Sequence, residues 1–141
     1  MKRPPPEEAV RWLTHARDEF LDADALRERG RFYLALFHFQ QAAEKALKAY
    51  LLAATQSVEV LRSHAIADLL ANASALDPEF RAVSLAKRLD QYYIPTRYPN
   101  GLPGGVPSRF YDDPAEAAEA ARLAREVLDL VERKLGAPEN H

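Results

Sequence analysis

The sequence contains no cysteine, and this absence excludes several kinds of chemistry at once. The chain can form no disulfide, no cysteine-ligated zinc or iron–sulfur site and no thiol nucleophile, which fits a reducing compartment. Its apolar runs are far shorter than the roughly 20 residues that a membrane span requires. The residues before Glu7 include three prolines and lack the apolar stretch that a signal peptide needs. We therefore expect a cytoplasmic protein that does not contact membranes.

Residues that favour β-strands are also few, whereas alanine occurs 25 times in the 141 residues. Alanine has the highest helix propensity, so the composition favours an all-helical fold. A chain of this length can bury a core without a disulfide or a metal, and no linker or internal repeat divides it. The formal net charge of −2 argues against nucleic-acid binding through bulk positive charge. We therefore predict one all-α domain over residues 1–141, with a core of about 8–135 and a frayed tail at 136–141.

Capping residues and apolar periodicity together predict five helices. Gly30 is suited to end the first helix in a left-handed conformation, and Asp77 and Asp113 each precede a proline at the first helical position. Glu116 stands where a capping box would place it after Asp113. The second helix is apolar on more than one face, so we expect it to be central. The predicted helices cover about residues 7–30, 31–54, 63–73, 77–93 and 113–135.

Proline and glycine concentrate in residues 94–112, which hold four of the ten prolines and three of the five glycines. This composition predicts a long irregular loop before the last helix. Between Tyr92 and Tyr111 the chain also carries four of its six tyrosines, together with Arg97 and Arg109. Aromatic faces stack on bases and arginine binds phosphate, so one interpretation is a loop that contacts a nucleotide or RNA. The alternative is that the aromatic side chains pack the loop onto the bundle and the arginines pair with nearby carboxylates.

Four polar residues of the second predicted helix lie at spacings of three and four, so they form one stripe: Gln41, Glu44, Lys45 and Lys48. A stripe of this kind can be an exposed face in which Glu44 pairs with Lys48 and Gln41 with Lys45. Alternatively, the two lysines contact a phosphate while Gln41 binds a base or a ribose. The periodicity does not decide between these two interpretations.

His64 precedes Asp68 by one helical turn, which leaves three roles open for the imidazole. It can be a ligand, a general base, or a helix-start residue that binds the backbone. A metal site at these two residues would need a third ligand that the sequence does not supply, so we predict no metal and no other cofactor apart from a possible nucleotide. His15 and His38 are interpreted as residues that fill helix faces.

Three segments of the chain, taken in order, resemble conserved blocks of one known family of helical domains. The segment 33–49, which reads YLALFHFQQAAEKALKA, resembles the central helix of HEPN domains. His64 with Leu69, and then YYIPTRYP at residues 92–99, resemble the later blocks of that family. The resemblance covers essentially the whole chain, over about residues 8–135.

The resemblance implies an up-and-down bundle of four to five helices that forms a homodimer. It also implies a partner, because HEPN proteins are often encoded beside a minimal nucleotidyltransferase as a two-component or toxin–antitoxin pair. Many are metal-independent ribonucleases whose site, assembled across the dimer, pairs an arginine with a histidine after four to six intervening residues. In this chain Arg97 is followed at those distances by residues 102–104, and Arg109 by residues 114–116, and none of these is histidine.

The pair Arg31 and His38 fits that spacing, but it lies at the beginning of the central helix, away from the family's catalytic segment. Arginine stays protonated and cannot act as a general base, so the missing histidine weakens the ribonuclease interpretation. We therefore predict a module that binds a nucleotide, a substrate or a nucleotidyltransferase partner, and that is not an enzyme. The resemblance carries over these site residues: Gln41, Glu44, Lys45, Lys48, His64, Arg97 and Tyr98.

Two alternative functions remain open at this point. One is a metal-independent ribonuclease or toxin, in which His64 or a tyrosine replaces the missing histidine. The other is a structural interaction protein, in which the loop at residues 94–112 docks another chain and no small ligand binds.

Overall fold

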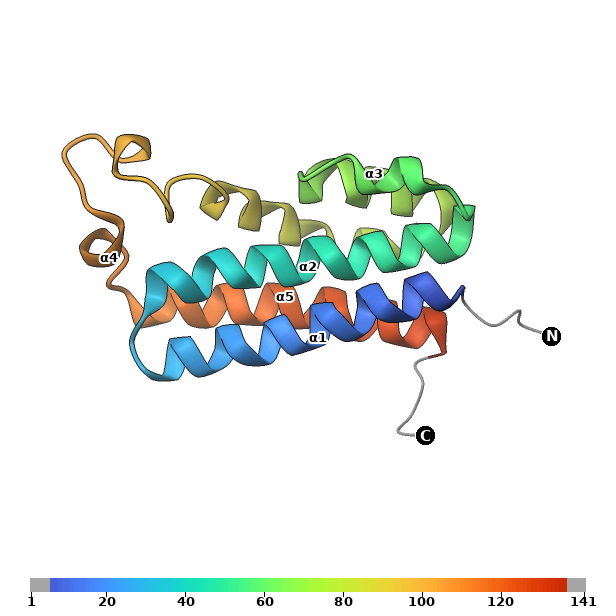
Figure 1. The fold of residues 1–141 in the computed structure, drawn as a ribbon, viewed down its shortest axis with the longest axis horizontal. Helices are drawn as coiled ribbons and strands as arrows, with labels where there is room; N and C mark the ends of the chain where they lie inside the picture. The colour runs from blue at the N-terminus through green and yellow to red at the C-terminus, as the bar shows by residue number, and fades with distance from the viewer. Residues whose placement is uncertain (1–5, 137–141) are drawn as a thin grey trace.

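Three long helices lie side by side and form the body of the fold (Figure 1). They are α1 (Glu7–Glu28), α2 (Phe32–Thr55) and α5 (Pro114–Leu135) in this computed structural model, which describes residues 6–136. A 3₁₀ helix, η2 (Pro78–Tyr92), fills the fourth position and runs antiparallel to α2, with α3 (Ile66–Leu76) packed beside it. The short elements are η1 (Val58–Leu61), η3 (Pro99–Gly101) and α4 (Pro107–Phe110).

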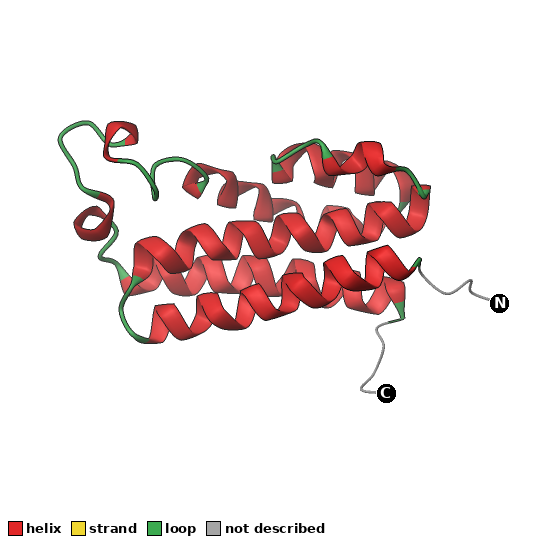
Figure 2. Ribbon diagram, in the orientation of Figure 1, coloured by secondary structure: helices red, strands yellow, loops and turns green. Residues whose placement is uncertain are grey.

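Helices are the only regular structure in residues 6–136 (Figure 2), which confirms the predicted all-helical, up-and-down fold class. Helix α2 is the central element because it contacts α1, α5, α3 and η2. Its apolar side chains are buried on more than one face, among them Leu36, Phe39, Leu47 and Leu51. None of the helices in this part of the chain is long and apolar enough to cross a membrane.

The predicted helix caps are present, with one exception at the start of α5. Gly30 adopts φ +78° in the turn after α1, and the side chain of Asp77 accepts a hydrogen bond from the Glu79 amide at 3.0 Å. Asp113 caps α5 in the same way, but the capping box predicted at Glu116 does not form. The Glu116 carboxylate instead accepts a hydrogen bond of 2.7 Å from the Tyr92 hydroxyl, because η2 brings that tyrosine against α5. Burial and this bond raise the pKa of Tyr92 above its ordinary range.

The third predicted helix differs from the structure in where it starts, and the fourth differs in its helix type. Helix α3 begins at Ile66, three residues later than expected, so that His64 lies in the extended segment before it. The segment 78–92 is a 3₁₀ helix with a kink at Val83 (φ −111°, ψ 21°). Its buried residues recur at every third position, namely Phe80, Val83, Ala86, Leu89 and Tyr92. This period matches the three residues per turn of a 3₁₀ helix, so the apolar stripe stays straight along the bundle.

The segment 94–112 lies at the end of the bundle where α1 turns into α2 (Figure 1). It is less irregular than predicted, because it contains η3 and α4. The buried Thr96 donates a hydrogen bond to the Tyr92 carbonyl, and Gly101 lies so close to Pro95 that a Cβ would be 3.0 Å from the Pro95 Cα. These contacts close the turn that carries Arg97. The predicted frayed tail lies, from residue 137 onward, outside the described residues.

Candidate functional site

A buried polar group lies in the middle of α2, on the side that faces α3. Lys48 Nζ is 2.8 Å from Glu44 Oε2, and the two side chains are only 2% and 3% exposed. Gln40, one turn earlier, is fully buried. Removing two charges from water costs several kcal/mol per ion unless they are paired and hydrogen-bonded, so these residues have to satisfy one another. Every buried side-chain nitrogen and oxygen in residues 6–136 does have a hydrogen-bond partner.

The Glu44 carboxylate also holds the imidazole of His64. His64 Nδ1 lies 3.1 Å from Glu44 Oε2, while the His64 side chain is 60% exposed. Because a carboxylate only accepts hydrogen bonds, Nδ1 carries the proton, and Nε2 is an acceptor in the neutral ring. No group within residues 6–136 hydrogen-bonds Nε2. The site therefore presents a free imidazole nitrogen to solvent on a ring whose orientation is fixed from the core.

The segment that carries His64 is fixed by a second set of hydrogen bonds, donated by Gln40 and accepted by Asp90. Gln40 Nε2 donates to the His64 carbonyl and to Asp90 Oδ1, each at 3.3 Å. Asp90, on η2, accepts from the amides of Ile66 at 2.8 Å and Ala67 at 3.0 Å. These are orphan amides at the start of α3, so Asp90 caps that helix from another element.

Arg97 packs against a group of aromatic side chains that extends from His64. The His64 and Tyr93 rings are nearly parallel, at 16° and 6.0 Å between centroids. The guanidinium carbon of Arg97 is 4.7 Å from the Tyr93 ring, 4.8 Å from Phe37 and 5.1 Å from Tyr98. Arg97 Nε donates to the Tyr93 carbonyl at 2.7 Å, whereas its two terminal nitrogens have no partner in residues 6–136. The arginine is thus held by three rings and keeps its terminal N–H groups available.

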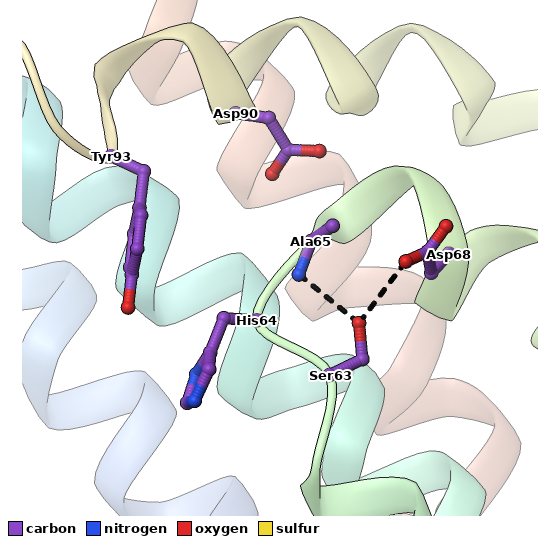
Figure 3. A pocket seen from close by; sticks show the side chains of 6 residues that line it. All are labelled: Ser63, His64, Ala65, Asp68, Asp90 and Tyr93. Carbon is purple, nitrogen blue, oxygen red and sulfur yellow. Dashed lines mark hydrogen bonds between the residues drawn. The ribbon is translucent and has the colours of Figure 1, made fainter.

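A cavity of about 360 Å³ opens beside the His64 ring (Figure 3). Figure 3 shows the His64 and Tyr93 rings on one side and Ser63 and Asp68 on the other. The Ser63 hydroxyl accepts from the Ala65 amide at 3.2 Å and donates to Asp68 Oδ2 at 3.4 Å. A pocket of this size, with aromatic and polar walls, is in the range that binds small molecules.

The structure brings together three residues of the predicted stripe and separates the fourth. Gln41 Nε2 donates to Gln40 Oε1 at 2.7 Å and to Glu44 Oε1 at 3.4 Å, so Gln41, Glu44 and Lys48 form one group with His64. Arg97 and Tyr98 join this group only through Tyr93. Of the two pairings expected for an exposed face, Glu44 with Lys48 exists but is buried, and Gln41 does not pair with Lys45.

Lys45 points toward α1, into a second cavity of about 400 Å³. Its ammonium is 2.6 Å from Glu19 Oε1 and 3.2 Å from His15 Nε2, while His38 Nδ1 is 2.7 Å from Glu19 Oε2. Burial raises the pKa of Glu19, but the hydrogen bonds and charges of His38 and Lys45 outweigh it and hold that pKa below its ordinary value. His15 and His38 thus take part in a polar cluster rather than filling helix faces.

The site residues that were not among those predicted include Gln40, Asp90 and Tyr93. Gln40 could have been suspected, since an uncharged amide on a helix that is apolar on more than one face needs a partner. Tyr93 lies in the segment that carries the family resemblance. Asp90 gives no signal in the sequence, because the amides it caps are more than 20 residues away.

In residues 6–136, no three His, Cys, Asp or Glu side chains are arranged to hold a metal ion.

A family model for the HEPN domain matches residues 9–134, which is most of the chain. The chain belongs to the HEPN domain family. Among similar solved structures, the crystal structure of TT1696 from Thermus thermophilus has 41% sequence identity and a TM-score of 0.76, covering 90% of this chain and 98% of that one. ST0689, an archaeal HEPN homologue, has 29% identity and a TM-score of 0.71, covering 96% and 99% of the two chains. No curated protein matches the sequence.

Proposed function

We propose that this HEPN protein is a nucleotide-binding module that works with a minimal nucleotidyltransferase partner and does not itself cleave RNA. The observation that carries the proposal is Arg97, whose guanidinium is held against three aromatic rings with its terminal nitrogens free of partners in residues 6–136. A free arginine fork binds phosphate in two parallel hydrogen bonds. Holding it in advance lowers the entropy lost when a ligand binds.

The neighbourhood of Arg97 supports a nucleotide rather than a simple anion. The Tyr93 ring that carries the guanidinium also lines the cavity beside His64. Aromatic faces stack on nucleobases, so one ligand can use the rings and the arginine together. Lys45 and Lys48 are poorer candidates for phosphate than the sequence suggested, because both ammonium groups are paired with glutamates and Lys48 is buried.

The non-catalytic part of the proposal rests on the missing histidine. The residues that follow Arg97 at the distance used by HEPN ribonucleases are Leu102, Pro103 and Gly104, none of which can accept a proton from a ribose hydroxyl.

Association with a nucleotidyltransferase subunit, in a toxin–antitoxin type of pair, and homodimerisation are further parts of the proposal. Exposed apolar side chains gather in the segment 94–110, where Ile94, Tyr98, Val106 and Phe110 are each about half exposed or more. Apolar groups of this size are enriched at protein interfaces.

Thermal unfolding in the presence of ATP, ADP, AMP, GTP, CTP or UTP tests nucleotide binding. A ligand at about 100 times its Kd adds roughly 2.7 kcal/mol, which should raise Tm by several degrees for a chain of this length. We expect at least one nucleotide to raise Tm, and the shift to disappear in Arg97→Ala. Arg97→Lys should retain only part of it, since an ammonium lacks the flat fork.

Arg109→Ala is the matched control, because Arg109 is an exposed arginine of the same segment that takes no part in the aromatic group around Arg97. It should leave the nucleotide shift unchanged. If no nucleotide shifts Tm, the nucleotide part of the proposal fails, and co-purification with the nucleotidyltransferase subunit becomes the test of the partner part.

A second candidate function, a metal-independent ribonuclease, is favoured by one observation. Within residues 6–136, His64 Nε2 has no partner while Nδ1 is held by the buried Glu44, as in enzymes where a carboxylate orients a histidine base. In that reaction Nε2 takes the proton of a ribose 2′-hydroxyl, and the oxygen attacks phosphorus. The bond from phosphorus to the 5′-oxygen breaks, and that oxygen takes a proton from water.

Incubating single-stranded RNA with the purified protein and no added metal separates the two candidates. The nucleotide-binding proposal expects intact RNA at high protein concentration. Cleavage that is lost in His64→Gln and retained in His15→Gln would establish the ribonuclease instead, because His15 belongs to the second cavity. Cleavage retained in both variants would indicate a contaminating nuclease.

A further inference from the structure

Two aspartates line the cavity beside His64, and only one of them has its hydrogen bonds satisfied. Asp90 is engaged through both oxygens, by the Ile66 and Ala67 amides and by Gln40. Asp68 has a single contact within residues 6–136, a hydrogen bond of 3.4 Å from the Ser63 hydroxyl to Oδ2. Its other oxygen, Oδ1, is available to accept from a ligand.

The charge of the cavity lining near Asp68 determines which chemical groups of a ligand can bind there. The cavity is lined by Ser63, His64, Ala65, Asp68, Asp90 and Tyr93, so no lysine or arginine of the described residues offsets Asp68 there. A carboxylate accepts hydrogen bonds and repels anions. A phosphate therefore does not belong here, whereas a neutral group with two O–H donors does.

We infer that Asp68 binds the ribose hydroxyls of the nucleotide and makes this HEPN protein selective for ribonucleotides over 2′-deoxyribonucleotides. This inference rests on the proposed nucleotide-binding function. The 2′ and 3′ hydroxyls are neighbouring donors that suit the two oxygens of one carboxylate, as acidic residues bind ribose in dinucleotide-binding folds. The His64 and Tyr93 rings lie on the opposite side of the cavity (Figure 3), where they can stack on the base. Arg97, which packs against the Tyr93 ring, supplies the positive charge for the phosphate.

The position of Asp68 favours a role in selectivity rather than in folding. It is an exposed residue in the first turn of α3, and the amides at the start of that helix are capped by Asp90. Asp68→Asn keeps the size and the bond to Ser63 but replaces one acceptor by a donor. The variant should fold normally, with an unliganded Tm close to that of the wild type.

Titration calorimetry with AMP, GMP, CMP and UMP, each beside its 2′-deoxy counterpart, tests the inference. For the wild type we expect a ribonucleotide to bind about tenfold more tightly than the deoxy form, the effect of one hydrogen bond to a charged group. In Asp68→Asn the ratio should fall to near one. Asp129→Asn is the matched control, since Asp129 is an exposed aspartate on α5 outside this cavity, and it should keep the wild-type ratio.

Each contrary result has a distinct meaning. Equal binding of ribo and deoxy forms by the wild type overturns the inference while the proposed function stands. A ratio that survives in Asp68→Asn shows that another group reads the ribose, which also overturns it. Loss of affinity in Asp68→Asn for GMP and dGMP alike assigns Asp68 to the guanine edge instead. If none of the eight nucleotides binds, the inference fails; the proposed function fails with it only if none of the nucleotides used in thermal unfolding raises Tm.

Discussion

Lys48→Ala is expected to lower the free energy of unfolding by about 3–5 kcal/mol, because it leaves the Glu44 carboxylate charged and buried without its cation. The Lys48 and Glu44 side chains are 2% and 3% exposed, so water cannot replace the lost ammonium. For a chain of this length the loss corresponds to a fall in Tm of about 10 °C or more. Thermal unfolding followed by circular dichroism measures it.

Two variants test whether burial is the cause. Arg122→Ala removes an arginine that bridges Glu119 and Glu126 at the surface, and it should lower the stability far less than Lys48→Ala does, because solvent screens exposed ion pairs. The double variant Glu44→Gln with Lys48→Met removes both buried charges and keeps an amide for His64, so it should be more stable than Lys48→Ala. A cost for Lys48→Ala as small as that of Arg122→Ala would mean that the pair is hydrated in solution.

Asp90→Ala should be the second most damaging change to the site, at about 2–4 kcal/mol. It removes the acceptor for two amides at the start of α3 and for the Gln40 amide, and hydrogen bonds to a charged group are among the strongest. Gln40, which holds the His64 carbonyl, loses its bond to Asp90, so nucleotide binding should weaken as well. Chemical denaturation gives the stability, and calorimetry with the nucleotides gives the binding.

Asp113→Ala is the matched control for this change. Asp113 caps α5 through a bond of 2.9 Å to Ala115, two residues away, and loss of such a local cap costs about 1 kcal/mol. Asp90 instead ties η2 to α3 and α2. Equal costs for the two alanine variants would show that Asp90 acts only as an ordinary cap.

The sequence was sufficient for the helices that local rules determine. Gly30 after α1 and the aspartate–proline pairs before η2 and α5 act within a few residues, and each was placed correctly from the sequence. The type of η2 was not predicted, although its apolar residues recur at every third position. On an α-helix, positions three residues apart rotate by about 60° at each step, so five of them would leave the packed face. The period of three is therefore itself a signal for a 3₁₀ helix.

The candidate site was predicted only in part, for a reason that Lys45 illustrates. Helical periodicity places Lys45 and Lys48 on the same side of α2. It does not predict which neighbouring element will pack against each of the two lysines. Helix α1 brings Glu19 to Lys45 and the Trp12 ring to Lys48, whereas His64, in the segment before α3, binds Glu44. Arg97 was named from the sequence, but the Phe37 ring beneath it comes from α2 and depends on how the chain folds back.

Glu44 belongs to the hydrophobic core and to the candidate site at the same time. One oxygen, Oε2, neutralises Lys48 inside the bundle and orients His64 at its surface. Under the proposed function, stability and ligand binding are therefore coupled at this residue. Replacing the ion pair with apolar side chains is a route to a more heat-resistant scaffold, but the same step would release the imidazole. Substitutions meant to stabilise the protein without releasing His64 should leave Glu44 in place and be made in the other helices of the bundle.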